Sequence, residues 1–311
     1  MGAYLCAMLL FGTLGLFVRQ AHVAGDVLAF LRTLIGAAFL GVLLLFQRHR
    51  IQKIGGRQLL YVLLSAAFLG FNWVFLFEAY AAATISIATV IYYTAPLLAL
   101  LAAVFLFHES VTLRIVLGIV LTMGGLLCIT QVTGTAVQLK GILFAAAAAL
   151  CYAGVLLTNR FLHDIDGLYF TFLQLLCSAG ILFVYLLLEG RIQLIPELPA
   201  ASWPWIMRIA VVHTGVAYAL YFTSLHHLTS SQAAVGSYLD PCIALLLSIF
   251  LLREPSTLMQ GIGIAAIVGG IISVIHQHEP CLVNFFVSSL SATAVSLTKA
   301  VQRVKTACAC S

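Results

Sequence analysis

Charged side chains are scarce in this 311-residue chain. Asp, Glu, Lys and Arg make up 8% of its residues, whereas hydrophobic residues make up 63%. Soluble globular domains contain roughly 25% charged and 45–50% apolar residues, so this composition cannot cover a water-exposed surface. The apolar runs are long and unbroken, whereas a membrane β-barrel would show alternating segments of about ten residues. The sequence therefore predicts an all-α integral membrane protein.

The chain also lacks the motifs of several enzyme and metal-binding classes. Its eight cysteines form no CxxC pair and no zinc spacing, and no glycine-rich phosphate loop is present. We therefore expect no cofactor and no metal. The net charge of +5 comes largely from one short loop and the tail, which indicates membrane topology rather than a nucleic-acid partner. The expected partners are a small-molecule substrate and the lipid bilayer, and a homodimer is left open.

An internal repeat is the most informative feature that the chain does contain. Residues 70–129 align with residues 215–274 without a gap, and 20 of the 60 aligned positions are identical. Apolar composition alone would not bring rare residue types into the same register. The shared positions include Tyr93 and Tyr238, Pro96 and Pro241, Glu109 and Glu254, Gly118 and Gly263, and Gly124-Gly125 and Gly269-Gly270. The chain is therefore one structural unit that has been duplicated.

Apolar runs separated by polar breaks predict ten transmembrane helices. They cover approximately residues 3–18, 27–46, 59–80, 87–107, 115–129, 141–162, 168–188, 205–225, 232–252 and 258–275. Five spans per repeat is an odd number, so the second copy enters from the opposite side of the membrane. The predicted architecture is two inverted five-helix repeats, at residues 1–137 and 138–276. The tail, residues 277–311, is either an amphipathic helix or disordered.

Basic residues predict how the chain is oriented in the membrane. The break between the second and third spans carries Arg48, Arg50, Lys53 and Arg57. Because cytoplasmic loops are enriched in Lys and Arg, this loop and both termini are expected to be cytoplasmic. The expected location is the plasma membrane, in bacteria the inner membrane.

The sequence resembles the EamA-type branch of the drug/metabolite transporter superfamily over residues 3–275. The residues that carry the likeness are Asn72-Trp73, Phe77, Ala79-Tyr80, Ala88, Tyr92 to Pro96, His108-Glu109, Thr112, Gly118 and Gly124-Gly125, with Pro241, Arg253-Glu254, Gly263 and Gly269-Gly270 in the second half. The family usually has a small residue where this chain has His108 and Arg253. The resemblance implies a carrier of small organic molecules that works by alternating access without ATP.

Asp240 and Arg32 are the charged residues expected closest to the middle of the membrane. Intramembrane charges are costly and usually functional. Asp240 precedes Pro241, whose missing N–H is expected to leave the carbonyl four residues earlier free, as in the kinked helices of transport sites. One interpretation is that Arg32 and Asp240 bind the substrate or couple its movement to protons. The alternative is a structural ion pair between the two helices.

Further polar residues complete the candidate site. His213 either relays protons or makes a hydrogen bond to a neighbouring span. Aromatic and amide side chains inside the spans form either a cavity wall or ordinary interhelical hydrogen bonds; they are Asn72, Trp73, Tyr92, Tyr93, Tyr152, Tyr218 and Tyr238. Pro96 and Pro241 are expected to kink their helices, and Glu109 and Glu254 either cap helices or act as gates.

The function predicted from these features is secondary transport of a small polar metabolite, such as an amino acid or a related zwitterion, by export or exchange. Coupling to protons is left open. The competing classes are a non-transporting membrane receptor or scaffold and a membrane-embedded enzyme. An enzyme would need clustered nucleophiles, bases or metal ligands, and the polar residues of the spans are too dispersed for that.

Overall fold

The computed structural model describes residues 2–82, 85–108, 112–130, 139–162, 164–225, 227–228, 232–233, 236–243, 246 and 257–275, and every regular element in them is helical. The elements are α1 (Gly2–Ala21), α2 (Gly25–Phe46), η1 (Arg48–Arg50), α3 (Gly56–Ala82), α4 (Ile85–Tyr92), α5 (Ala95–Phe107), α6 (Leu113–Thr130), α7 (Leu139–Arg160), α8 (Gly167–Leu188), η2 (Ile192–Leu194), η3 (Ala200–Ser202), α9 (Trp203–Arg208), η4 (Ile209–Val216), α10 (Ala217–Leu225) and α13 (Leu258–Ile275).

The described residues contain six helical segments that are long and apolar enough to cross a membrane, and three shorter apolar helices. The long segments are residues 25–46, 56–80, 88–107, 139–160, 167–188 and 200–225, and the shorter ones lie within α1, α6 and α13. This confirms the helical, multi-span character of the part of the chain that the structure describes. Glu109, Glu254 and the tail lie outside the described residues, and so do 10 of the 21 residues of the predicted span at 232–252.

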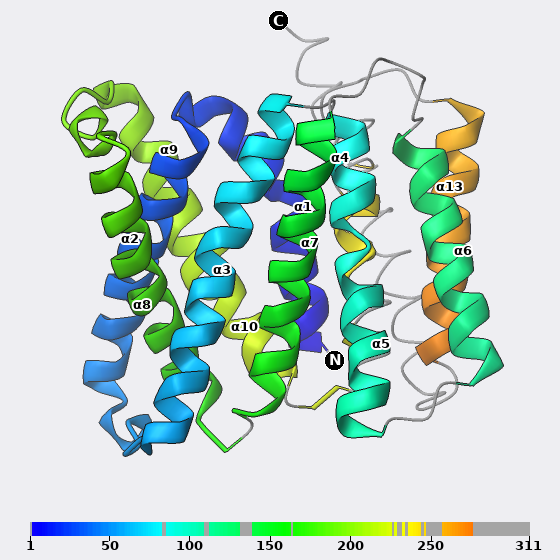
Figure 1. Cartoon of the computed structure of the whole chain (residues 1–311), viewed down its shortest axis with the longest axis horizontal. Helices are drawn as coiled ribbons and strands as arrows, with labels where there is room; N and C mark the ends of the chain where they lie inside the picture. Colours follow the sequence, from blue (N-terminus) through cyan, green and yellow to red (C-terminus); the bar gives the residue numbers. More distant parts are fainter. Residues whose placement is uncertain are drawn as a thin grey trace, which may run out of the picture.

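The long helices lie side by side in one bundle (Figure 1). Three pairs are in close contact along their lengths: α2 with α8, α3 with α7, and α6 with α13. The α6–α13 pair forms one edge of the bundle, and α2 and α8 lie toward the opposite edge (Figure 1). Large apolar side chains such as Phe105, Leu150 and Val120 are more than half exposed, which suits contact with lipid rather than water.

The predicted span at residues 87–107 is broken in two. Helix α4 ends at Tyr92, Tyr93 and Thr94 form a turn, and α5 begins at Ala95. Pro96 explains the break, because it lacks an N–H and its ring restricts the residue before it. Pro96 therefore lies in the first turn of a new helix, where proline is tolerated.

The second repeat has a matching break before Pro241. Ser237 and Tyr238 form a turn, and helical residues resume at Leu239. The expectation of a free carbonyl at Ser237 is wrong, because this oxygen accepts a hydrogen bond from the Asp240 N–H at 3.3 Å. The tight turn thus satisfies the acceptor that Pro241 leaves unpaired.

One span contains a π-helix that the sequence pattern did not predict. Helices α9 and α10 are joined without interruption by η4, an eight-residue π-helical segment from Ile209 to Val216. A π-helix hydrogen-bonds five residues back instead of four, and such segments are frequent at functional sites. It widens the helix next to α2, at the level of His213 and Thr214.

Candidate functional site

A cavity of about 80 Å³ lies where helices of the two repeats meet. A water molecule needs roughly 10–15 Å³ on this scale, so the cavity is large enough for several. Its lining combines one cation, one carboxylate, one amide and a ring of aromatic and aliphatic side chains. These residues are Phe11, Leu14, Arg32, Leu69, Asn72, Trp73, Tyr92, Tyr152, Val155, Tyr218, Tyr221, Phe222 and Asp240.

Arg32 supplies the positive charge of the cavity. It is the eighth residue of the 22-residue α2, which places its Cα roughly 10 Å from the helix start at a rise of 1.5 Å per residue. Its side chain is 1% exposed, and its Nε donates to the Thr214 hydroxyl at 2.8 Å. The Arg32 guanidinium carbon lies 4.1 Å from the centre of the Trp73 ring, a cation–π geometry. Its buried Nη2 has no hydrogen-bond partner.

Asp240 supplies the negative charge. Its Oδ2 accepts a hydrogen bond of 2.7 Å from the Tyr93 hydroxyl. Tyr238 in turn donates its hydroxyl to the backbone carbonyl of Tyr93 at 2.7 Å. That carbonyl belongs to the turn between α4 and α5, so the helix break provides the acceptor. The Tyr93 and Tyr238 rings lie 6.0 Å apart between centroids, and these two residues are equivalent positions of the repeat.

Arg32 and Asp240 line the same cavity without an ion pair between them in the described structure. The predicted alternative of a direct structural pair is therefore not what the structure contains. Each charge is instead held by neutral hydroxyl and aromatic groups. A charge in low dielectric without an opposite charge is costly, so both groups favour a ligand that supplies one.

Asn72 is fixed by hydrogen bonds on both sides of its amide. Its Nδ2 donates to the Ala148 carbonyl of α7 at 2.9 Å, and its Oδ1 lies 3.5 Å from the Tyr92 hydroxyl. Tyr92 stacks on Tyr152 with ring centroids 5.5 Å apart. The Tyr152 hydroxyl also lies 3.0 Å from that of Tyr221. These contacts join α3, α4, α7 and α10 into one polar and aromatic wall.

The remaining predicted residues lie apart from the cavity lining. His213 is 2% exposed, and its Nε2 lies 2.9 Å from the Thr13 hydroxyl of α1. Its ring also contacts Phe17, at 4.7 Å between centroids. Tyr93 and Tyr238 are not among the residues that line the cavity, but Tyr93 bonds to Asp240, which is, and Tyr238 bonds to Tyr93. The contacts of His213 therefore fit the second of its two predicted roles, a hydrogen bond to a neighbouring span.

The sequence did not single out two residues that belong to this region. Thr214 contacts Arg32 only because η4 turns its hydroxyl toward α2, and no pattern signalled that π-helix. Tyr221 could have been grouped with the other tyrosines, since it lies three residues after Tyr218 on the same helix face. Its ring stacks on Tyr4 of α1 at 5.6 Å between centroids.

A second cavity, of about 160 Å³, lies at the end of the bundle where α2 begins and α8 ends. Asp26, Glu78 and Arg191 contribute its charged groups. Arg191 Nη1 and Asp26 Oδ2 form an ion pair of 2.7 Å, with Asp26 almost fully buried. Glu78 is therefore part of a charged cavity rather than an isolated side chain at a helix end.

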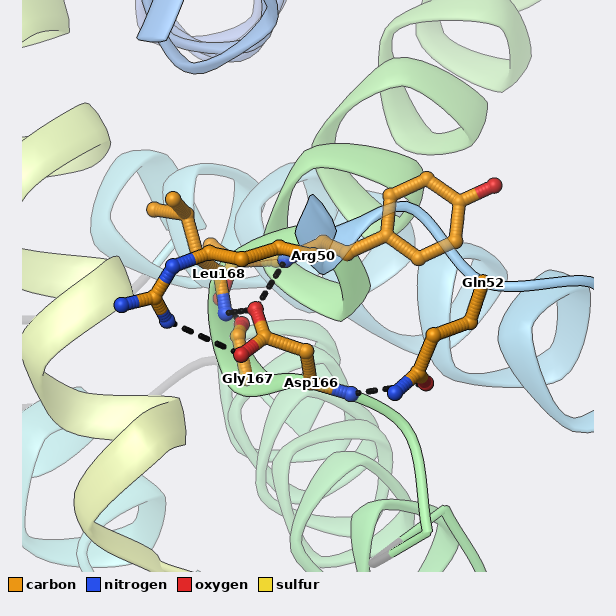
Figure 2. Close-up of polar contacts among 7 residues, drawn as sticks. Arg50, Gln52, Asp166, Gly167 and Leu168 are labelled. Carbon is orange, nitrogen blue, oxygen red and sulfur yellow. Dashed lines mark hydrogen bonds and ion pairs between the residues drawn. The ribbon is translucent and has the colours of Figure 1, made fainter. Parts of the chain in front are cut away.

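A corresponding ion pair lies at the opposite ends of α2 and α8 (Figure 2). Arg50 Nη1 donates to Asp166 Oδ2 at 2.9 Å. Asp166 is also the N-cap of α8, because its Oδ1 accepts from the backbone N–H groups of Leu168 and Tyr169 at 3.0 and 3.2 Å. The Asp166 N–H donates to Gln52 Oε1 at 3.2 Å. The loop after α2 is thereby tied to the start of α8.

Comparison with known proteins identifies the family. The model of the EamA-like transporter family matches residues 1–131 and again residues 139–276. The chain belongs to the EamA-like transporter family. YxxF, an uncharacterized transporter of Bacillus subtilis (strain 168), is 30% identical over 269 residues, covering 85% of each chain. An uncharacterized transporter of Archaeoglobus fulgidus is 28% identical over 274 residues, or 87% of this chain and 94% of that relative.

A solved structure supports the fold of this EamA-like chain. A protein crystal structure with 21% sequence identity superimposes with a TM-score of 0.73, covering 88% of this chain and 97% of the other. At that identity the likeness concerns the fold alone. The family and the apolar helices together make the protein a multi-pass membrane protein of the transporter type. The cavity between its repeats is the candidate site.

Proposed function

We propose that this protein is a secondary transporter that moves a small zwitterionic solute, such as an amino acid, by alternating access. The observation that carries the proposal is the separate placement of Arg32 and Asp240 in one aromatic cavity. A guanidinium can hold a carboxylate through paired hydrogen bonds. A carboxylate without a cationic partner can take an ammonium group or a proton. A zwitterion supplies both complementary charges at once.

The aromatic wall supports a solute with an organic body rather than an inorganic ion. Trp73, Tyr92, Tyr152 and Tyr218 line the same cavity as the two charges. Such rings bury apolar groups, while their N–H and O–H groups satisfy polar ones. Arg32 lies between Trp73 and Tyr218, at 4.1 and 5.7 Å from the ring centres. These two aromatics are equivalent positions of the repeat.

The proposed mechanism needs two inverted repeats, and the α6–α13 contact supports that arrangement. A Cβ atom on Gly125 would lie 2.6 Å from the Gly263 carbonyl oxygen, and one on Gly270 would lie 2.6 Å from the Gly118 carbonyl oxygen. The repeat relates Gly118 to Gly263 and Gly125 to Gly270. Exchanging the two helices therefore turns one contact into the other, as at a two-fold axis. The order of the contacts also makes the helices antiparallel.

The two ion pairs support the same arrangement. Asp26 at the start of α2 pairs with Arg191, which follows α8. Asp166 at the start of α8 pairs with Arg50, which follows α2. Exchanging α2 and α8, which are both 22 residues long, brings each pair to the helix ends where the other pair lies, with the carboxylates two positions and the arginines one position out of exact register. If the repeats are inverted across the membrane, the pairs lie on opposite faces, with Arg50 on the cytoplasmic side.

Counterflow of labelled amino acids in proteoliposomes tests this function. We expect at least one amino acid to exchange faster than in protein-free vesicles. Arg32→Gln should raise KM for that amino acid about 10–150-fold, the worth of a charge-assisted hydrogen bond of about 1.5–3 kcal/mol. Asp240→Asn should abolish accumulation driven by a proton gradient while leaving exchange.

Two exposed charges provide matched controls for these variants. Lys53→Gln and Glu189→Gln each remove one charge from an exposed position, so both should transport like the parent protein. A panel of amino acids that shows no exchange above the vesicle background would reject the carrier and favour a receptor or scaffold. Unchanged transport and pH dependence in Asp240→Asn would remove Asp240 from the coupling mechanism.

A further inference from the structure

We propose that Thr214 is a positioning residue that orients Arg32, and that the π-helical segment η4 is what presents its hydroxyl to Arg32. The inference rests on the proposed function for its meaning in transport, because Arg32 is the group offered to the solute carboxylate. It goes beyond that function by assigning a role to an uncharged residue and to an irregular stretch of helix.

The first step concerns the hydroxyl itself. Thr214 is fully buried, and its hydroxyl donates to the Ile209 carbonyl, five residues earlier, at 3.2 Å. Other described helical threonines bond three or four residues back, such as Thr13 to Leu10 at 2.7 Å and Thr171 to Gly167 at 2.6 Å. The π-helical register therefore changes the direction of the Thr214 hydroxyl.

The second step concerns the oxygen that this bond leaves available. A hydroxyl has one donor and two acceptor positions. Since Thr214 uses its proton on Ile209, its oxygen can only accept, and it accepts from Arg32 Nε at 2.8 Å. Arginine can only donate, so the Thr214 oxygen must accept, and the Ile209 carbonyl of η4 gives the hydroxyl proton a partner that is compatible with this role. A side chain without the hydroxyl would leave the buried Nε–H unpaired, which costs free energy.

The third step is the effect on the guanidinium. The Nε–H of Arg32 donates to Thr214, and the guanidinium group lies over the Trp73 ring with its carbon 4.1 Å from the ring centre. The two Nη groups at the end of the guanidinium remain for a ligand, and Nη2 is buried without a hydrogen-bond partner. A carboxylate can therefore bind across the two Nη groups but not along the edge that contains Nε. Thr214 selects which edge of Arg32 meets the solute.

The approach of α2 to η4 is close enough to make this contact depend on a glycine. Gly36 lies one turn after Arg32, and a Cβ there would be 3.2 Å from both the Ala210 carbonyl oxygen and the Thr214 methyl carbon. Contacts of that length are tighter than most real Cβ contacts. The local sequence of α2 is thus adapted to the widened helix that carries Thr214.

A solute-independent test uses the fluorescence of Trp73. The other two tryptophans are replaced by the changes Trp203→Phe and Trp205→Phe, so that the emission reports the charge stacked on Trp73. We expect Arg32→Gln to shift the emission maximum and Thr214→Val to shift it in the same direction. Thr214→Ser, which keeps the hydroxyl, should retain the parental spectrum. If Thr214→Val fails to fold, Thr214→Ala takes its place in the comparison.

Three results would overturn the proposal. They are a parental spectrum in Thr214→Val, a shifted spectrum in Thr214→Ser, and an Arg32→Gln spectrum without any shift. The last result would contradict the stacked geometry on which the proposal stands. None of them depends on transport, so the role of Thr214 can fail while the proposed function holds.

The transport measurement uses the amino acid that gives the strongest counterflow and its carboxamide, which lacks the negative charge. Thr214→Val should raise KM for the amino acid at least fivefold with little change in kcat, and leave KM for the carboxamide nearly unchanged. In the Arg32→Gln background, Thr214→Val should add no further effect, because Thr214 acts through Arg32. Equal losses for both solutes, or additive losses in the double variant, would instead indicate a general structural role. If no amino acid is transported, the proposed function fails, and the Trp73 spectra still decide the role of Thr214.

Discussion

The α6–α13 contact makes a sharp prediction, because adjacent glycines differ completely in their surroundings. A Cβ on Gly125 would lie 2.6 Å from the Gly263 carbonyl oxygen, whereas a Cβ on Gly124 would meet no atom within 4 Å. In the second repeat, a Cβ on Gly270 would lie 2.6 Å from the Gly118 carbonyl oxygen. Gly125→Ala and Gly270→Ala should therefore destabilise the protein, and Gly124→Ala should not.

The expected size of the effect follows from these distances. Ordinary contact begins at 3.4 Å, so an alanine at position 125 must push a backbone oxygen away by about 0.8 Å, the difference from 2.6 Å. Neither partner is a flexible side chain that could move aside. Overpacking of this kind costs about 1–3 kcal/mol, which lowers the melting temperature by a few degrees. Replacing an unhindered helical glycine by alanine is instead neutral or stabilising by up to about 1 kcal/mol.

Thermal unfolding of purified protein in detergent, followed by intrinsic fluorescence, measures the difference. Gly269→Ala is the matched control in the second repeat, because its nearest neighbour, Leu121, is 3.6 Å away. Equal losses in Gly124→Ala and Gly125→Ala would refute the packing argument. A loss in Gly125→Ala without one in Gly270→Ala would refute the symmetric contact, and with it one support for the inverted repeats.

Two other features give further predictions. Asp166→Ala removes both the N-cap of α8 and the ion pair, and should lower the free energy of unfolding by about 1–2 kcal/mol. Arg50→Gln removes only the ion pair, which is partly exposed, and should lower it by less than about 1 kcal/mol. Unfolding measurements on both variants check this order, and a larger loss in Arg50→Gln than in Asp166→Ala would contradict it. Lys53→Cys and Glu189→Cys, in a chain without native cysteines, should react with a membrane-impermeant maleimide from opposite sides, and labelling from one side would rule out inverted repeats.

Much of the fold was predictable because the sequence contains strong, redundant signals for it. Apolar runs of about 20 residues specify spans regardless of detailed packing, and the confirmed all-helical bundle follows from them. The family follows from motifs that occur twice in register. The break before Pro96 was only partly predicted. A kink was expected there, but sequence alone does not reveal that two residues leave the helix entirely.

Residue type was the part of the candidate site that the sequence could indicate. Arg32, Asn72, Trp73, Tyr92 and Asp240 were selected as polar groups inside spans, and the structure brings all five into the lining of one cavity. Their roles in transport stay predictions. What the sequence could not provide was their partners. Whether two buried charges pair depends on helix rotation and on shifts of a few ångströms, which no periodicity encodes.

The π-helical segment shows the same limit. The residues of η4 are an ordinary apolar stretch, and the register of a helix depends on the packing around it rather than on that stretch alone. Thr214 could have been noted as a hydroxyl in mid-span, but most helical hydroxyls bond to their own backbone, as those of Thr33 and Thr122 do. Only the three-dimensional structure separates the exception from this majority.

Asp240 of the cavity lining and Thr214, the hydrogen-bond partner of Arg32, lie at positions where the two repeats differ. At the constant offset of 145 residues, Asp240 corresponds to Ala95, and Thr214 corresponds to Leu69. The aromatics that flank the charges are instead kept in both copies, as Trp73 with Tyr218 and Tyr93 with Tyr238. If the repeats are inverted and the protein works by alternating access, as proposed, the aromatic positions that both copies share would present similar cavity walls to the two faces of the membrane. A solute with different charges at its two ends needs an asymmetric site, and substitution in one copy alone provides it without disturbing the packing that both copies share.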